Sequence, residues 1–433
     1  MKHRVHWIGA LAMIASAASA QVPAAGGKPA SRADSVARAD SVRRAVEDSI
    51  ALVKKFEAMQ AGNAQVPPAV PTPTGGAGGP VNPRMLPDFS AVGDLIGDLT
   101  GERSTQPDGT RFGVREVELA IQSAIDPYFR GDIFLGISAL EGISIEQAFL
   151  TTTSLPYGLQ AQVGRFLMPV GKENTTHRHD LHTVEYPHVL QRFFSDDGLK
   201  GTGATLSKIV SPFGFYQEVI VSVVDRFGER DAGLTASVAA NKALDGLGAS
   251  ARLRNYVDFG ESANAELSAS AITGRREQPL SAASFGINAL NLRQTTVGLD
   301  LTIRWKPLRQ GLYQSFILQG EVLRQFNELP SAAALPPGLT YAGPVGDFTG
   351  GYLFARWQLS QRLYAGGRYD HVEDPQSGGA ALRAASIVLE WFPSEFSKLI
   401  AQFEHAALPG VSAVNRLLLQ ATFAMGPHKP HPF

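Results

Sequence analysis

Polar and apolar residues alternate strictly along much of the C-terminal part of the chain. In residues 296–306 every odd position is apolar, and every even position is small, polar or charged. A β-strand places alternate side chains on opposite faces, so one face here is apolar and the other carries Asp300, Arg304 and Lys306. The same alternation recurs at 116–122, 132–137, 264–269 and 416–423. This pattern predicts an all-β fold, a transmembrane antiparallel β-barrel with an apolar outer face and a polar interior.

The number of such segments sets the size of the barrel. We predict about sixteen strands from the alternation and the turn signals between them. They are placed at 86–98, 112–125, 128–140, 143–153, 157–168, 201–211, 214–227, 246–259, 262–274, 291–306, 311–327, 346–360, 362–374, 380–392, 395–406 and 412–426. The segments at 143–153 and 311–327 alternate least clearly.

The connections between the predicted strands alternate in length. Tight connections such as 126–127 and 393–394 follow even-numbered strands. Most of the opposite connections are longer, notably 169–200, 228–245, 275–290 and 328–345. Bacterial outer-membrane barrels have short periplasmic turns and longer external loops, so this parity supports a barrel with an even number of strands. Aromatic residues near strand ends suit the interfacial girdles of such a barrel: Tyr128, Phe129, Trp305, Trp391 and Phe392.

The N-terminal part of the chain differs from the rest. Residues 1–20 have the basic start, short apolar stretch and small-residue cleavage site of a secretory signal peptide. Residues 21–60 form a predicted helical segment with an apolar stripe, for which a short coiled coil and a solvated tail are equal alternatives. Residues 61–84 are a linker rich in Pro and Gly, and residues 85–433 form the predicted barrel. The chain is therefore expected in the bacterial outer membrane, with its N-terminal segment in the periplasm and lipid around its barrel.

Composition removes several classes of function. The chain has no cysteine, which excludes disulfides, thiolate metal sites and catalytic thiols. Its formal net charge of −1 argues against nucleic acid as a partner. The sequence has no nucleophile elbow, phosphate-binding loop or zinc-protease motif, so we expect no enzyme activity.

One local motif resembles a known family. The stretch Gln-Val-Gly-Arg-Phe-Leu-Met-Pro-Val-Gly-Lys-Glu-Asn at 162–174 is similar to the strand and turn that lead into the third external loop of the phosphate-selective porin O and P type of outer-membrane channel. Gly-Leu-Lys-Gly at 198–201 resembles the start of the following strand in that family. The resemblance implies a sixteen-stranded barrel that forms homotrimers and carries an N-terminal helical segment. The crowded lumenal Arg and Lys residues that give the family its anion specificity are not evident in this chain.

Two sets of charged residues are candidates for the lining of a pore. In porins the loop corresponding to 169–200 folds into the lumen and narrows it, and charges there select solutes. The candidate constriction residues are Lys172, Glu173, Arg178, Asp180, Glu185, Arg192, Asp196 and Asp197. Charges on the polar faces of strands should also point inward, because a charge at the lipid midplane costs ~2–4 kcal/mol. The candidate lumen residues are Arg252, Arg254, Asp300, Arg304, Lys306, Arg356, Arg368 and Asp370.

The same loop is rich in histidine. Four of the ten histidines fall within 177–188, and imidazole is the commonest metal ligand in proteins. His177, His179 and His182 are candidate ligands for zinc, although loop histidines also serve as ordinary polar surface. No other cofactor is expected. The sequence thus favours a porin for passive diffusion of small hydrophilic solutes or ions through a charged lumen. The alternatives are a metal-capturing outer-membrane receptor that uses the histidine loop, and a membrane-embedded enzyme or adhesin.

Overall fold

The described part of the chain is a β-barrel. The computed structural model describes residues 87–101, 103–139, 142–225, 234, 246–281 and 288–426. The predicted signal peptide, the helical segment 21–60 and the linker 61–84 lie outside the described residues. Among the residues that are described, no helix is both long enough and apolar enough to cross a membrane.

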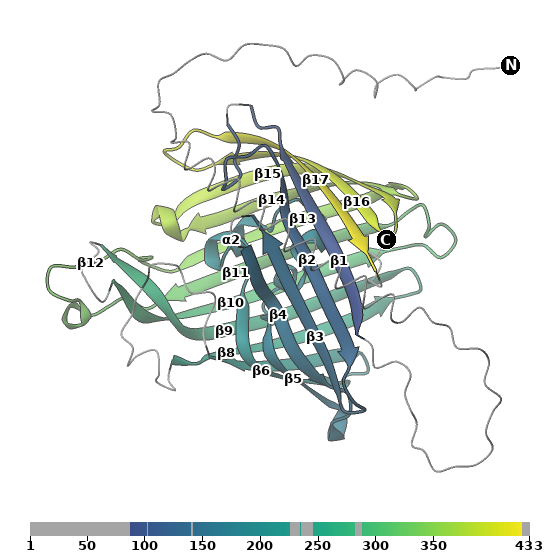
Figure 1. Cartoon of the computed structure of the whole chain (residues 1–433), viewed down its shortest axis with the longest axis horizontal. Coiled ribbons are helices and arrows are strands. Elements are labelled where there is room, and N and C mark those ends of the chain that lie inside the picture. The colour runs from purple at the N-terminus through teal and green to yellow at the C-terminus, as the bar shows by residue number, and fades with distance from the viewer. Residues whose placement is uncertain are drawn as a thin grey trace, which may run out of the picture. The chain divides into compact units, whose positions relative to one another are not determined.

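The wall of the barrel, drawn in Figure 1, contains sixteen strands. The seventeen strands of the sheet, less the two-residue strand β12, give this number. The wall strands are β1 (Asp88–Asp98), β2 (Phe112–Ala124), β3 (Phe129–Ser138), β4 (Gly142–Thr152), β5 (Leu159–Leu167), β6 (Lys200–Val210), β7 (Tyr216–Val224), β8 (Gly248–Phe259), β9 (Ala263–Ser281), β10 (Ala289–Trp305), β11 (Phe316–Asn327), β13 (Phe348–Ser360), β14 (Leu363–Asp374), β15 (Ala380–Ser394), β16 (Ser397–Ala407) and β17 (Val414–Met425). Each is antiparallel to its neighbours, and β1 pairs with both β2 and β17, which closes the sheet. The predicted fold and strand number are confirmed.

Short elements complete the described structure. β12 (Thr340–Tyr341) lies outside the wall order and pairs with Leu280 and Ser281 at the end of β9. α2 (His188–Phe193) is a short helix between β5 and β6. The 3₁₀ turns are η1 (Pro156–Gly158), η2 (Glu173–Thr175), η3 (Arg178–Asp180), η5 (Ala332–Ala334) and η6 (Pro375–Ser377).

The alternation in β10 has the expected structural consequence. The side chains of Val297, Leu299 and Leu301 lie on the outer face, and Leu299 is 60% exposed. Asp300, which alternates with them, points inward and is 1% exposed, and Thr302 is likewise buried. An apolar exterior and a polar interior suit a wall with lipid outside.

Some strand bounds differ from the sequence prediction. β9 continues to Ser281 and β10 begins at Ala289, so the predicted loop 275–290 is largely a hairpin that extends the sheet. β11 begins at Phe316 instead of residue 311, because residues 306–315 form a hydrogen-bonded turn in which Tyr313 N–H donates to the Gln310 carbonyl. The weak alternation at 311–315 therefore reflects a turn. We call the end of the barrel with the turns 260–262, 306–315 and 361–362 the turn end.

Two β-bulges place adjacent charged or polar residues inside the barrel. In β2 the register shifts between Val114 and Glu116, which leaves Arg115 as the extra residue. In β4 the register shifts between Ile145 and Gln147, which leaves Glu146 as the extra residue. A bulge inserts one residue into a strand and changes which face the next residues occupy. The bulge in β4 explains why the alternation at 143–153 is weak.

Aromatic side chains collect on the outer face at the turn end. The rings of Trp305 and Trp357 stack with centroids 5.6 Å apart, and Phe316 lies 5.7 Å from Trp357. Trp391 is likewise exposed on the outer face. Phe392, which the sequence suggested for the same girdle, is instead buried against Tyr364 at 5.7 Å, because the next residue along a strand faces the opposite side.

Candidate functional site

Residues 168–199, which connect β5 to β6 and which we call the inner segment, fold into the barrel interior. α2 of this segment packs against β13 and β14 (Figure 1). Its first residues contact β8 and β9: Gly171 N–H donates to Ser270 Oγ on β9 at 3.2 Å, and Arg252 on β8 donates to the Gly171 carbonyl. His177 lies 2.8 Å from Glu118 on β2, seven strands from β9 in the wall order. The inner segment therefore extends across the lumen from one side of the wall to the other.

Charged side chains of the wall satisfy the backbone of the inner segment. Lys398 Nζ donates to the carbonyls of His179 and Leu181 at 2.5 and 2.7 Å. Arg368 donates to the carbonyl of Glu185 at 2.8 Å. On the other side of α2, Arg276 donates to the carbonyls of Phe193 and Phe194, both at 3.0 Å. Buried backbone groups require partners, so these cations replace the strand pairing that an irregular segment lacks.

An apolar cluster fixes the same segment. Aromatic and aliphatic side chains of the inner segment pack against inward-facing apolar side chains of the wall. The members from the inner segment are Met168, Val170, Leu181, Tyr186, Val189, Leu190, Phe193, Phe194 and Leu199, and those from the wall include Val224, Ile272, Leu323, Phe354 and Val372. All are buried, so their packing excludes water from this part of the lumen.

The candidate constriction residues fall into two groups. One group bonds to the wall: Lys172 Nζ lies 3.2 Å from Glu266, Glu173 accepts from Gln319, and Arg192 donates to Gln376 at 2.7 Å. These pairs connect the inner segment to β9, β11 and η6.

The other group pairs within the inner segment. Arg178 Nη1 lies 3.0 Å from Asp197, and its second terminal nitrogen donates to the Asp196 carbonyl at 3.3 Å. Asp180 lies 3.7 Å from His179, and Glu185 accepts from Gln191 at 3.2 Å. The segment thus has its own network of charged pairs.

Burial and neighbouring charges change the proton affinity of two of these residues. Burial lowers the pKa of the Lys172 ammonium, and the carboxylate of Glu266 opposes that effect without cancelling it. For Glu185, burial raises the pKa, but the charges of Arg178 and Arg416 outweigh it and keep the pKa below its usual value. Glu185 is therefore ionised at neutral pH, and the guanidinium groups of Arg178, Arg416 and Arg115 balance its charge.

The candidate lumen residues also divide into two groups. Arg252, Asp300, Arg356, Arg368 and Asp370 are buried and at most 4% exposed. Arg252 pairs with Asp300 at 3.2 Å, Arg368 pairs with Asp370 at 2.8 Å, and Arg356 pairs with Glu390. These residues support the inner segment instead of facing open water.

Arg254 and Arg304 retain more contact with solvent. Arg254 is 32% exposed and bonds to Glu218 at 2.8 Å, while Arg304 is 36% exposed and lies 3.9 Å from Glu266. Lys306 lies just beyond β10, on the turn 306–315. Arg304 and Lys306 belong to a cavity of about 590 Å³ at the turn end.

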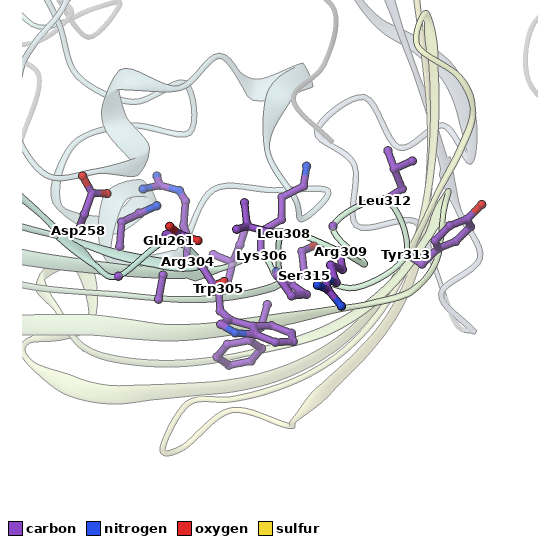
Figure 2. Close-up of a pocket in the computed structure, with 18 of the residues that line it drawn as sticks. Asp258, Glu261, Arg304, Trp305, Lys306, Leu308, Arg309, Leu312, Tyr313 and Ser315 are labelled. Atoms are coloured by element: carbon purple, nitrogen blue, oxygen red, sulfur yellow. The ribbon is translucent and has the colours of Figure 1, made fainter.

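This cavity forms a vestibule (Figure 2). Figure 2 shows Arg304 and Lys306 on one side of the strand ribbon and Trp305 on the other, and Arg309 follows on the turn. Asp258 and Glu261 supply acidic groups on the lining. The vestibule therefore presents both signs of charge.

The four histidines of the inner segment do not form a single cluster. His177 Nδ1 lies 2.8 Å from Glu118 of β2, and His179 Nδ1 lies 3.9 Å from the same carboxylate oxygen. His182 lies elsewhere, 3.3 Å from Glu390 and 2.9 Å from Arg356. The structure therefore brings His177 and His179 together and places His182, the third candidate ligand, in a different cluster.

Sequence reasoning missed several wall residues that contact the inner segment. Glu118 and Glu390 are on inward faces of β2 and β15, but nothing in the alternation distinguishes them from other polar positions. Arg276 could have been found, because it continues the even-numbered inward face of β9 beyond the predicted end of the strand. Arg115 could not, since its inward direction depends on the bulge.

Comparison with known proteins agrees with the fold. No family model matches the chain. An uncharacterized protein of Aquifex aeolicus (strain VF5) is 26% identical over 350 residues, which cover 74% of this chain and 70% of that protein. A loop L8 deletion mutant of OmpT, an outer membrane protein of Vibrio cholerae, matches with a TM-score of 0.50 at 11% identity over 78% of this chain and 99% of its own. OprB of Pseudomonas putida also matches with a TM-score of 0.50, at 9% identity over 78% of this chain and 94% of its own. The likeness to both solved structures is one of fold.

Proposed function

We propose that the chain forms an outer-membrane pore for passive diffusion of small hydrophilic solutes or ions, with the inner segment as its constriction. The observation that carries this proposal is the position of the inner segment within a closed sixteen-stranded barrel. Barrels of eight strands fill their interiors with their own side chains, whereas sixteen strands leave a channel that a loop can narrow. The apolar outer face of the wall supports a location in lipid.

The arrangement of charge supports a narrow pathway. Lys172, Arg178, Arg254 and Arg304 remain partly exposed. Arg252, Arg356 and Arg368 of the wall are instead buried and bond to the inner segment. We therefore propose ions and small solutes as the cargo instead of large ones. Trimer formation, which the family resemblance implies, remains a prediction, and so does the periplasmic position of the N-terminal segment. Phosphate selectivity is not proposed, because the crowded lumenal Arg and Lys residues of that family are not evident in this chain.

Single-channel recording tests this function. The full chain, folded and inserted into a planar bilayer in KCl, should give steady current steps that are proportional to voltage. Replacing residues 173–197 by a short Gly-Ser linker should raise the conductance several-fold, since it removes the constriction. Shortening residues 331–338 near η5 is the control, and it should leave the conductance within about a factor of two because most of those residues are exposed.

Two outcomes would contradict the proposal. Folded protein without conductance in either form would mean that the barrel is no pore. Conductance that appears only after residues 173–197 are removed would make the inner segment a plug. Barrel folding is verified by the altered electrophoretic mobility of unheated samples.

A further inference from the structure

Glu118, His177 and His179 converge where the inner segment meets β2. Their ligand atoms all lie within 4.8 Å of one another. We propose that these three side chains bind a divalent late transition-metal cation, with Zn²⁺ as the reference ion. This inference does not depend on conduction, because metal binding can be measured on the folded barrel alone.

The donor set and its spacing fit such a cation. Two imidazole nitrogens and one carboxylate oxygen form a His₂Glu set, which leaves a fourth position for water in tetrahedral zinc sites. Ligand atoms about 2.0–2.1 Å from a tetrahedral ion lie about 3.3 Å apart. The observed distances from the Glu118 oxygen, 2.8 Å to His177 Nδ1 and 3.9 Å to His179 Nδ1, lie on either side of that value. Small side-chain rotations would equalise them.

The group behind the His179 imidazole also suits metal binding, whereas the one behind His177 would have to adjust. Metal-bound histidines usually donate their second ring N–H to a carboxylate or carbonyl oxygen, which fixes the ring. His179 Nε2 faces the Asp180 carboxylate at 3.7 Å. Behind His177, Nε2 lies 2.8 Å from Gln147 Nε2, an N–H donor, because Gln147 Oε1 accepts from Leu167 N–H at 3.2 Å. A cation on His177 Nδ1 would leave the ring proton on Nε2, so the Gln147 amide would have to turn over to accept it. Without metal, His177 Nδ1–H donates to Glu118, so the cation would take the place of that proton.

The surroundings offer space and a negative potential. A cavity of about 30 Å³ adjoins the three side chains, which is room for about one water-sized species. Glu116, Glu146 and Asp197 also line it, against the cations Arg178 and Lys200. Glu118 and His179 are buried, whereas the His177 side chain is 23% exposed, so an ion can reach the site from the lumen.

Local structure explains why these residues meet. His177 immediately precedes η3 and His179 lies within it, and the tight turn directs both rings toward β2, with their centroids 5.4 Å apart. His182 follows η3 and contacts β13 and β15 instead. A bound cation would fasten the inner segment to β2, in addition to the cationic side chains that hold it from β14 and β16.

Zinc titration of the full chain folded in detergent tests the site. Isothermal titration calorimetry with Zn²⁺ should show one tight site in the natural protein. The affinity should fall at least ~10-fold in His179→Ala and in Glu118→Gln, which keeps the shape of the side chain and removes its charge. His182→Ala is the matched control from the same segment and should retain the natural affinity. Co²⁺ should show the visible absorption of a tetrahedral site in the natural protein and not in His179→Ala.

A gain-of-affinity variant keeps the test independent of misfolding. Gln147→Glu places a carboxylate behind His177 that can accept from both its Nε2–H and Leu167 N–H, so zinc affinity should rise, by about 10-fold. The proposal is overturned if tight binding survives in His179→Ala and Glu118→Gln, if His182→Ala loses it equally, or if Gln147→Glu binds no more tightly than the natural protein.

Discussion

The backbone of Gly171 is held against the barrel wall through both its N–H and its carbonyl group. Its N–H donates to Ser270, and its carbonyl accepts from Arg252. Its φ of +66° belongs to the left-handed region, and a Cβ there would overlap the carboxylate of Glu321. This residue therefore combines a backbone requirement with a steric one at the point where the inner segment turns inward.

Gly171→Ala should displace the start of the inner segment. Left-handed backbone costs a non-glycine residue of order 1–3 kcal/mol, and the clash with Glu321 adds to it. We expect faster protease cleavage within 168–199 in the folded barrel, measured by mass spectrometry. Gly109→Ala is the control, because Gly109 has a φ of +72° but no atoms near its Cβ position. Equal cleavage in both variants would show that the contact with Glu321 is unimportant.

His182 gives the inner segment a dependence on pH. Burial lowers its pKa, as does the charge of Arg356, while Glu390 opposes them and Lys398 adds further positive charge. The folded state therefore holds this proton less tightly than the unfolded state, whose pKa is about 6.5. Its contribution to stability is complete above that value and is lost as the pH falls through it toward the folded pKa.

Acidification from pH 8 to pH 5 should therefore loosen the inner segment near His182. Hydrogen exchange of residues 180–185, corrected for the intrinsic rate at each pH, should show weaker protection at pH 5. His182→Asn should reduce this change, since it removes the titrating group. An identical pH response in His182→Asn would assign the effect to other residues.

At the scale of the element, the wall strands and the inward position of the inner segment were predictable, but the contacts between them were not. Strand alternation depends on local sequence, because each residue faces lipid or lumen by its position alone. It fails where the wall is bulged, at Arg115 and Glu146, and where the lumen is apolar, at Leu323. Leu323 points inward because the inner segment covers it, and that contact cannot be read from β11 itself.

Removing a cationic side chain from the wall should destabilise the inner segment more than the wall strands. Lys398→Met would leave the His179 and Leu181 carbonyls without their donor, at a cost of about 1–3 kcal/mol for each buried group. Hydrogen exchange should increase in 179–185, while the strands stay protected. Lys208→Met, at an exposed position of β6, should change neither. Unchanged exchange in Lys398→Met would mean that apolar packing alone fixes the segment.

At the scale of the whole molecule, the exposed apolar side chains on the outer face of the wall lead to a separate prediction about stability in lipid. Leu299→Arg places a charge on the exposed apolar face of β10, which should destabilise the barrel in lipid by up to ~2–4 kcal/mol. Leu308→Arg, on the turn after β10, should have little effect although Leu308 is also exposed. Urea unfolding in lipid vesicles measures both. Equal stability of the two variants would argue that β10 does not face lipid.

The candidate site was likewise predictable only in part: the sequence indicated its charged residues but not their partners. Charges on the inner segment were predictable from loop length and family resemblance, since a long loop after the fifth strand is typical of an inserted constriction. Their partners were not, because pairs such as Lys172 with Glu266 and His177 with Glu118 join residues far apart in the chain. Only closure of the barrel brings the two members of each pair together, so the sequence alone could not identify these pairs.

The dependence of the inner segment on β16 has a consequence for biogenesis. Lys398 lies 219 positions after His179 in the chain, so the hydrogen bond between them joins residues of very long sequence separation. Contacts of such long sequence separation form late and slowly. A nascent chain that has inserted its early hairpins must keep these carbonyls hydrated until the final strands arrive. The inner segment should therefore become ordered only after the barrel has closed. Assembly should pass through an intermediate with a complete wall and a hydrated interior.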